Sequence, residues 1–592
     1  METSTTDIVI VGAGGAGLRA AIAAAEAHPA LEICLISKVY PMRSHTVAAE
    51  GGAAGVIQEH DALAHHFDDT VSGGDWLCDQ DVVQYFVENA TPEMIRLEHW
   101  GCPWSRRSDG QVNVRPFGGM KIERTWFAAD KSGFHILHTL FQTSTKYPQI
   151  RRLDEHFCLD LLVADGRAQG VVAHDLARGV TRMVCARAVI LATGGAGRVY
   201  QFNTNAGIVT GDGMALAYRH GVPLRDMEFV QYHPTGLPGT GILMTEGCRG
   251  EGGVLTNRDG YRYLQDYGLG PETPPGEPRN KTMELGPRDR LSQSFWHEEQ
   301  QGRTIDTRWG AAVNLDLRHL GAARINERLP FIRELAQAYV GIDPVSEPIP
   351  VRPAVHYTMG GIEAQLNCAT RLPGLYAVGE CASVGLHGAN RLGSNSLAEL
   401  SVFGRLAGES AAEYAADQRP AEPAALKQSA AASLQRARAV IKPSGTERLA
   451  DIRRALGQAM ESGLGIYRSA DGMQACCDKL QSLRERYAKL CVTDTSTVFN
   501  TEWLSALELG FLLDVAQSMA HSALARRESR GSHQRIDGYT TRDDANYLQH
   551  SLASYRPGAA PHIEYAAVTI TRSPPGVRAY GGELKALEQT DG

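Results

Sequence analysis

The sequence lacks the features that define several large classes of protein. Its 59 Lys and Arg are outnumbered by 67 Asp and Glu, which gives a net charge of −8. This balance argues against general electrostatic binding of nucleic acid or anionic lipid. No run reaches the ~18 apolar residues of a membrane-spanning helix. The apolar N-terminal stretch contains Asp7 and Arg19 and has no basic start, so it is not predicted to be a signal peptide. We expect no direct insertion into a membrane.

Cysteine is present but follows no pattern. The 11 Cys residues are scattered and none forms a CxxC pair, so spacing predicts neither a zinc site nor an iron–sulfur cluster. His135 and His138 lie three residues apart without a third ligand, and we expect no metal site. An odd, dispersed set of cysteines is typical of reduced thiols in a cytosolic protein.

Glycine, in contrast, is abundant: it makes up 62 of 592 residues, about 10%, whereas the average share in proteins is ~7%. A buried strand is predicted at residues 7–11, an Ala-rich helix to about His28 and a second strand at 31–37. Between the first strand and the helix stand Gly12, Ala13, Gly14, Gly15, Ala16 and Gly17. This GxGxxG turn lets the backbone approach a pyrophosphate at a helix N-terminus. The acidic residue expected about 20 positions later is replaced by Ser37-Lys38, which weakens the reading of a plain NAD site.

Two later segments repeat the pattern of a strand that runs into a glycine turn. They are residues 188–197 and residues 375–380, and the second ends in Glu380, whose carboxylate suits a polyol hydroxyl. Three such elements spread over this length predict one large, discontinuous cofactor domain. An extended dinucleotide such as FAD fits that arrangement better than separate sites do.

Composition divides the rest of the chain. Residues 40–80 are rich in glycine and are expected to be irregular, and a helix is predicted at 80–99. Two proline-rich segments, 271–278 and 346–353, indicate loops or hinges around an inserted domain. Apolar stripes with helical spacing then dominate residues 424–490. We predict an α/β fold, in which a Rossmann-like FAD-binding domain (1–235 and 350–420) is interrupted by a capping domain (236–349) and followed by a helical domain (421–540) and a small C-terminal segment (541–592).

Long, chemically specific blocks between residues 7 and 545 point to one family. The blocks are RSHTVAAEGG (43–52), GGDWLCDQD (73–81), FGGMKIERTWFAADK (117–131), QYHPTGLP (231–238), LMTEGCRGEGG (243–253), MELGPRD (283–289), HYTMGG (356–361), GLHGANRLGSNSLAEL (385–400) and ARRESRG (525–531). On these blocks the chain resembles the succinate dehydrogenase/fumarate reductase flavoprotein family, and within it the bacterial, quinol-linked fumarate reductases.

The resemblance implies an FAD bound covalently through His45 to the flavin 8α-methyl group. It also implies the direction of the reaction. Fumarate reductases of the family tend to have Glu at position 50, as this chain does, whereas succinate dehydrogenases tend to have Gln there. Further implied FAD contacts, besides the glycine-rich turn, are Ser37, Lys38, Ser44, Thr46, Glu50, Gly51, Gly52, His156, Phe157, Cys158, Asp212, Glu380, Arg391, Ser396 and Leu397.

The resemblance also assigns a site for a small dicarboxylate, which needs cations and donors in fork geometry. Arg391 and His356 would hold one carboxylate, and His233 and Thr245 the other. Arg288 would donate the proton. Because the pKa of Arg is above ~12, this donor needs a relay to restore its proton, and the matching relay residues are Glu246 and Arg249.

The implied function is reduction of fumarate to succinate by hydride transfer from FAD. Since the chain lacks cluster cysteines, electrons would come from quinol through an iron–sulfur subunit and membrane anchor subunits. That places the protein on the cytoplasmic face of the bacterial inner membrane, held there by its partners. The alternatives are a succinate dehydrogenase flavoprotein subunit, an L-aspartate oxidase-like enzyme, which the His45 motif disfavours, and a nucleotide-binding module without turnover, which has no need of a proton relay.

Three further expectations concern single features. Ser394 or Asn395 should cap a helix whose N-terminus faces the flavin. Two neighbouring arginines should favour the thiolate of Cys248, so that an alkylating reagent inactivates the enzyme and substrate protects it. A basic cluster forms either a docking surface for the electron-transfer partner or a solvated, ion-paired face; it consists of Arg526, Arg527, Arg530 and Arg535.

Overall fold

A five-stranded parallel sheet lies at the centre of the structure, a computed structural model that describes residues 1–420 and 422–581. Its strand order is β19 (Leu375–Ala377), β11 (Ala188–Leu191), β2 (Ile8–Val11), β3 (Ile33–Ser37) and β7 (Ile150–Asp154). The three strands that precede the predicted glycine turns, β2, β11 and β19, are direct neighbours. The prediction that these distant segments build one structure is therefore confirmed.

Both faces of this sheet are covered, which explains why its strands are continuously apolar. Ile8 and Ile10 pack with helices on one face, and Val9 and Val11 pack with a second sheet on the other. The helices are α1 (Gly15–Ala27), α3 (Gln80–His99), α4 (Ser132–Ser144) and α10 (Asn395–Asp417). The second sheet contains β1 (Glu2–Thr5), β8 (His156–Ala164), β9 (Arg167–Asp175) and β10 (Val180–Cys185).

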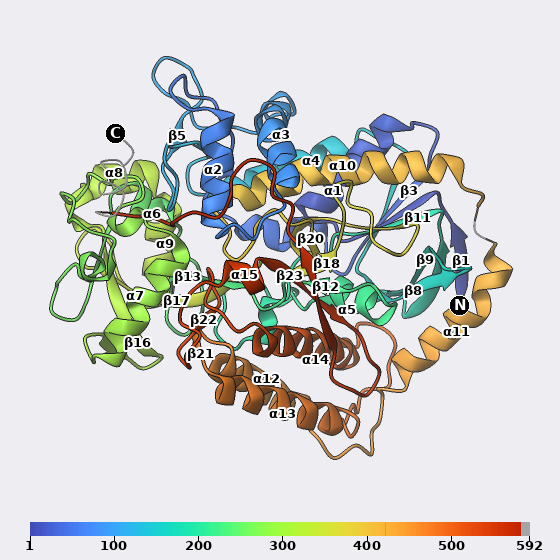
Figure 1. The fold of residues 1–592 in the computed structure, drawn as a ribbon. Helices are drawn as coiled ribbons and strands as arrows, with labels where there is room; N and C mark the ends of the chain where they lie inside the picture. The colour runs from blue at the N-terminus through green and yellow to red at the C-terminus, as the bar shows by residue number, and fades with distance from the viewer. Residues whose placement is uncertain (421, 582–592) are drawn as a thin grey trace.

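A separate hydrophobic cluster lies in the green part of the chain in Figure 1. It surrounds an antiparallel sheet of β13 (Val230–Gly236), β17 (Ile349–Thr358), β16 (Gly310–Asp316) and β14 (Val254–Thr256), with β15 (Ile305–Thr307) at its side. The helices of this region are α6 (Gly247–Gly250), α7 (Arg288–Gln300), α8 (Gly321–Arg328) and α9 (Pro330–Val340). This separate core supports our proposal of a capping domain at 236–349, whose first residue ends β13 and whose last residue begins its partner strand β17.

The C-terminal third is mainly helical, as the apolar stripes predict. Its helices are α11 (Pro423–Arg438), α12 (Leu449–Gly463), α13 (Ala470–Tyr487) and α14 (Thr501–Ala525), and non-helical segments separate them. Figure 1 shows α12, α13 and α14 side by side below the parallel sheet. The last described strands, β23 (Gln549–Ser554) and β24 (His562–Ala567), pair with each other, and β23 also pairs with β12 (Leu224–Arg225). The end of the predicted C-terminal segment, 582–592, lies outside the described residues.

One local prediction was wrong. Residues 40–80 were expected to be irregular, but they contain α2 (Leu63–Gly73), which buries Phe67 and Val71 against α3. The remaining elements are short: β4 (Ala53–Ala54), β5 (Val114–Arg115), β6 (Thr125–Trp126), α5 (Asp212–Arg219), β18 (Gly361–Glu363), β20 (Ala382–Ser383), β21 (Tyr467–Arg468), β22 (Gln534–Arg535) and α15 (Asp544–Tyr547).

No helix within residues 1–420 and 422–581 has both the length and the hydropathy that crossing a bilayer requires.

A buried histidine ties the C-terminal hairpin to the rest of the fold. His550, on β23, contacts Asp226 through Nδ1 at 2.6 Å and Asp79 through Nε2 at 3.3 Å. Burial by itself lowers the pKa of His550, but the two carboxylates outweigh it and raise the pKa to about 9. The imidazolium is therefore the form that stabilises the fold at neutral pH.

We predict a pH dependence of stability from this ion pair. Because the folded pKa lies above the unfolded value of about 6.5, its contribution of about 3 kcal/mol is complete below about pH 6.5 and is lost as the pH rises through 9. His550→Gln should remove this loss and lower the melting temperature at neutral pH, as followed by calorimetry from about pH 6 to about pH 10. His562→Gln, at an exposed histidine paired with Glu564, is the control. An unchanged pH profile in His550→Gln would contradict this assignment.

Candidate active site

A cavity of about 710 Å³ lies where the carboxyl edge of the parallel sheet meets β13 and β17. Most of the residues predicted to bind cofactor or substrate line it. The predicted cofactor contacts in its wall are Gly12, Ala13, Gly14, Gly15, Ala16, Ser37, Lys38, Ser44, His45, Thr46, Glu50, Gly51, Gly52, His156, Cys158, Asp212, Glu380, Arg391, Ser396 and Leu397. The predicted catalytic residues in its wall, besides Arg391, are His233, Thr245, Glu246, Arg288 and His356. Gly17, Phe157 and Arg249 do not line the cavity.

The glycine-rich turn has two kinds of glycine. Gly12 has φ +111°, and a Cβ at Gly17 would lie 1.8 Å from the carbonyl oxygen of Gly12, so both are needed for the turn itself. A Cβ at Gly14 would meet no protein atom closer than 3.4 Å, and this residue lines the cavity. The absence of a side chain at Gly14 therefore leaves room for a ligand against the backbone. Gly17 does not line the cavity, and its missing side chain instead permits the close approach of the Gly12 carbonyl within the turn.

Lys38, in the place of the usual acidic residue, is held by an ionic cluster. Its Nζ donates to Asp212 at 2.7 Å, to Glu508 at 2.8 Å and to the hydroxyl of Thr210 at 2.8 Å. Burial lowers the pKa of Lys38, but Asp212 and Glu508 outweigh this effect and raise it. Sequence reasoning missed Glu508, which lies 470 residues from Lys38 on α14 and has no recognisable motif.

His45 lies at the other end of the cavity with a neutral imidazole. Burial lowers the pKa of His45 to about 4. The backbone N–H of Ala206 donates to its Nδ1 at 3.4 Å, which leaves Nε2 as the nitrogen available for attachment. Burial and the charge of Asp130 raise the pKa of Glu50, another residue in the cavity wall, well above its ordinary value.

The helix N-terminus at the cavity differs from the prediction. Ser394 precedes α10, but neither its side chain nor any other caps the helix through a hydrogen bond. The hydroxyl of Ser394 instead pairs with Thr125 at 2.9 Å, and the Asn395 amide contacts His66. Because the side chains turn away, the first backbone N–H groups of α10 remain available at the cavity, next to Ser396 and Leu397. Burial raises the pKa of the nearby Glu380 to about 7.

Two histidines face each other because β13 pairs with β17. The ring centroids of His233 and His356 are 5.2 Å apart. Burial and the positive charge of Arg288 lower both of their pKa values well below the ordinary range, so both rings are neutral. The Thr235 N–H donates to His233 Nδ1 at 3.3 Å, and this backbone donor favours the tautomer with the ring proton on Nε2. The Thr235 hydroxyl, which donates to the Met244 carbonyl at 2.7 Å, lies 3.2 Å from the same Nδ1. Nε2 of His233 is buried and has no hydrogen-bond partner among the described residues.

Two arginines complete this end of the cavity, and a glutamine joins them. Arg288 is the first residue of α7, and Arg391 precedes α10. Gln231 Oε1 accepts from Arg288 Nη1 at 3.0 Å and from Arg391 Nη2 at 3.1 Å. Arg391 Nε is buried and has no hydrogen-bond partner in residues 1–420 and 422–581, and burial together with Arg288 lowers the pKa of Arg391 to about 10.

Gln231 was missed by sequence reasoning, although a signal existed. It stands two residues before His233 on the same strand, and side chains two apart on a strand share a face. Its amide nitrogen donates to Asn390 Oδ1 at 3.0 Å and to the Arg391 carbonyl at 2.7 Å, so its hydrogen-bonding groups are all used. This neutral side chain separates two cations without cancelling their charge.

The predicted relay residues are in contact. Glu246 Oε2 accepts from Arg288 Nε at 2.8 Å and Nη2 at 2.6 Å, and Glu246 Oε1 lies 3.5 Å from Arg249 Nη2. Burial opposes ionisation of Glu246, but the two guanidiniums outweigh it and hold its pKa below the ordinary value. Arg249 therefore contacts Glu246, which lines the cavity, but does not line the cavity itself.

The prediction for Cys248 was wrong. Its thiol is fully buried, and burial, Glu50 and Asp130 together raise its pKa against the opposing arginines, Arg115 and Arg249. The thiol is therefore neutral in this conformation, and reaction with an alkylating reagent requires an opening that exposes it. Desolvation is the largest effect on the pKa of Cys248, and it outweighs the positive charges of Arg115 and Arg249.

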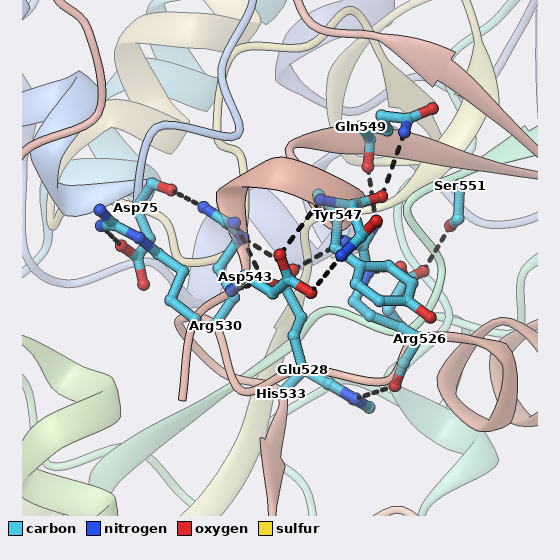
Figure 2. Close-up of polar contacts among 12 residues, drawn as sticks. Asp75, Arg526, Glu528, Arg530, His533, Asp543, Tyr547, Gln549 and Ser551 are labelled. Carbon is cyan, nitrogen blue, oxygen red and sulfur yellow. Dashed lines mark hydrogen bonds and ion pairs between the residues drawn. The ribbon is translucent and has the colours of Figure 1, made fainter. Parts of the chain in front are cut away.

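Of the two alternatives for the basic cluster, the docking surface was wrong for all but Arg527, the one of the four arginines that is exposed. The other three are ion-paired, as the second alternative had it, but they are buried and not solvated. Arg526 pairs with Glu228 at 2.6 Å and with Glu528 at 2.9 Å. Figure 2 shows Arg530 between Glu528 and the backbone of Asp75. Arg535 is buried as well and pairs with Asp537. These arginines join the end of α14 to the loop that precedes α3, and they are part of the protein interior.

In the described part of the chain, no group of three or more His, Cys, Asp or Glu side chains is arranged to hold a metal ion.

Comparison with known proteins gives consistent matches over the whole chain. Residues 7–397 match the family model described as FAD binding domain, and residues 453–580 match the model described as Fumarate reductase flavoprotein C-term. The Fumarate reductase flavoprotein subunit of Serratia sp. (strain ATCC 39006) is 66% identical over 592 residues, 100% of this chain and 99% of that protein.

A solved structure of Escherichia coli quinol fumarate reductase with a mutation in FrdA has a TM-score of 0.97 at 65% identity and covers 98% of this chain and 100% of that one. The Succinate dehydrogenase flavoprotein subunit of Rickettsia bellii (strain RML369-C) is 41% identical over 585 residues, 95% of each protein.

Proposed function

The chain belongs to the fumarate reductase flavoprotein family, and from this premise we propose that it is the catalytic flavoprotein subunit of a fumarate reductase that converts fumarate to succinate. Membership makes it an oxidoreductase with an FAD-binding domain. The observation that carries the specific activity is the group of two arginines and two neutral histidines at one end of the FAD cavity. That group matches a dicarboxylate dianion.

The cavity fits FAD on grounds independent of the family. Gly14 leaves its backbone open, and two buried polar atoms, Ser44 Oγ and Glu50 Oε2, have no hydrogen-bond partner within the described residues. The glycine-rich turn and the free N-terminus of α10 would hold the negatively charged parts of the cofactor. When bound, FAD supplies the hydride for the reaction. We propose covalent attachment at His45 Nε2.

Donors without partners define the substrate end. His233 Nε2 and Arg391 Nε are both buried and unpaired within the described chain, although each can only donate here. Two such groups carry a desolvation cost that an anionic ligand removes. We propose that His233 and Thr245 hold one carboxylate of fumarate, and that Arg391 and His356 hold the other.

Proton delivery follows from the contacts of Arg288. Fumarate gains a hydride at one alkene carbon and needs a proton at the other to become succinate. We propose that the Arg288 guanidinium gives up this proton and recovers one through Glu246 and Arg249, which lie in sequence behind it. Arg288 Nε and Nη2 both donate to Glu246 Oε2, which keeps the guanidinium oriented and favours its reprotonation after each transfer.

The electron path is proposed from the relatives. The matched structure is of a quinol fumarate reductase, which supports delivery of electrons from quinol through an iron–sulfur subunit on membrane anchor subunits. We propose that the chain binds to such partners at the cytoplasmic face of the bacterial inner membrane.

Succinate dehydrogenase is the main alternative, because the same site can work in either direction. Identity of 41% to a succinate dehydrogenase subunit against 66% to a fumarate reductase subunit favours fumarate reduction. Glu50, in the cavity wall, is the family's marker of this direction. An L-aspartate oxidase-like activity is disfavoured by the His45 motif.

The proposed activity predicts an asymmetry that a direct assay measures. The purified complex, supplied with matched quinol or quinone, should reduce fumarate faster than it oxidises succinate. Faster succinate oxidation would favour the dehydrogenase alternative. No turnover of either acid, with FAD bound, would favour the binding module instead.

We predict that His45→Ser abolishes covalent attachment. Acid-precipitated wild-type protein should stay yellow, whereas the variant should release its FAD into the supernatant. Since an alkylated histidine raises the flavin potential, the variant should keep fumarate reduction better than succinate oxidation. His135→Ser, on α4 and outside the cavity, should remain covalently flavinylated. Equal loss of both activities in His45→Ser would contradict the argument from potential.

Replacing Gln231 should weaken the positioning of both arginines, Arg288 and Arg391, because each donates to its side-chain oxygen. Gln231→Met keeps a neutral side chain of similar length but removes the shared acceptor, so the KM for fumarate should rise about tenfold and kcat should also fall. Gln293→Met is the matched control, because that buried amide donates to the Gly531 carbonyl outside the cavity. Steady-state kinetics with fumarate, normalised to bound FAD, give the comparison. Equal kinetics for the two variants would exclude the bridging role.

A further inference from the structure

A loop outside the recognised motifs holds the substrate-side histidine. Thr204 lies in the cavity wall, and its hydroxyl is 2.8 Å from Nδ1 of His356. The neighbouring Asn205 donates from its side-chain amide to the backbone carbonyl of His356 at 3.0 Å. Two adjacent residues therefore contact both the ring and the backbone of the same histidine.

The loop is held in register with the strand that bears His356. The N–H of Thr204 donates to the Val355 carbonyl at 2.8 Å, and Asn203 forms a parallel bridge with Val355. The Asn205 N–H donates to Asn203 Oδ1 at 3.0 Å, which closes the turn. These bonds fix the position of the Thr204 hydroxyl relative to β17.

The direction of the Thr204–His356 hydrogen bond decides what the histidine can do. Burial and nearby cations keep His356 neutral, so only one ring nitrogen carries a proton. If Thr204 donates to Nδ1, the proton is on Nε2 and the ring can donate to an anion. If Thr204 accepts from Nδ1, Nε2 presents a lone pair, which a carboxylate repels.

Two contacts favour donation by Thr204. The Asn205 amide lies 3.3 Å from Thr204 Oγ1 and donates to it, which leaves the hydroxyl proton free for Nδ1. The facing His233 has a backbone donor, the Thr235 N–H, at its own Nδ1, which favours a proton on Nε2 there as well. The same tautomer on both rings gives two donors towards one dianion.

We propose that Thr204 is a positioning residue that donates its hydroxyl proton to His356 Nδ1 and so holds His356 as an Nε2–H donor for a substrate carboxylate. This inference rests on the proposed fumarate reduction. It adds a specific requirement, which is that recognition of the dicarboxylate depends on a hydroxyl that does not itself bind the substrate.

Three variants test the proposal in the purified complex. Thr204→Val keeps the shape but removes the hydroxyl, and it should raise the KM for fumarate about tenfold with a smaller change in kcat. Thr204→Ser restores the hydroxyl and should return the KM to within about twofold of the wild type. In a His356→Ala background, Thr204→Val should change the KM by less than about twofold, because its target is gone.

The chain provides a matched control. Thr181 bonds to Nδ1 of the buried His174 at 3.2 Å, in the sheet of β9 and β10 and outside the cavity. Thr181→Val removes an equivalent hydroxyl and should leave the KM unchanged. Covalent FAD content and melting temperature, measured for every variant, separate a binding effect from misfolding.

Three outcomes would overturn the proposal. One is a wild-type KM in Thr204→Val, and another is a KM that rises equally in Thr204→Val and Thr204→Ser. The third is an undiminished effect of Thr204→Val in the His356→Ala background, which would show that Thr204 acts independently of the histidine. Failure of the proposed function is distinct, because the wild-type complex itself would then not turn over fumarate.

Discussion

The antiparallel pairing of β13 with β17 is the contact on which the site depends. Its register places Gln231 opposite Tyr357 and His233 opposite Ala354, so that His233 and His356 approach from strands far apart in the sequence. The chain between these strands folds around its own hydrophobic cluster and returns with Arg288 at the start of α7. One strand pair therefore brings together groups from both sides of the cavity.

Burial controls the charge of this site more than the number of charged residues does. Desolvation keeps His233, His356 and His45 neutral and raises the pKa of Glu50. Arginine resists the same effect because its intrinsic pKa is far higher, so the positive charge that remains belongs to the guanidiniums. A neutral glutamine between two of them preserves that charge for an anionic ligand.

The same principle explains the predictions that failed. Arg526 and Arg530 are basic residues in a basic sequence cluster, but both are fully buried against Glu228, Glu528 and Asp75 (Figure 2). Cys248 has an arginine beside it in the sequence, but desolvation raises the pKa of its thiol. A sequence shows which charges are near along the chain, whereas the pKa depends on which are near in space and on how much water remains.

Local patterns in the sequence were sufficient for the βαβ unit, the glycine turn at Gly12 and Gly17 and the helix at 80–99, because backbone geometry and hydrophobic periodicity act over short distances. The motif blocks also named most of the residues that line the cavity. Only the tertiary structure revealed Gln231 as a bridge, Thr204 beside His356 and Glu508 beside Lys38. These contacts join residues that chain spacing does not relate, and they arise only when strand pairing and helix packing bring separate segments to the same cavity.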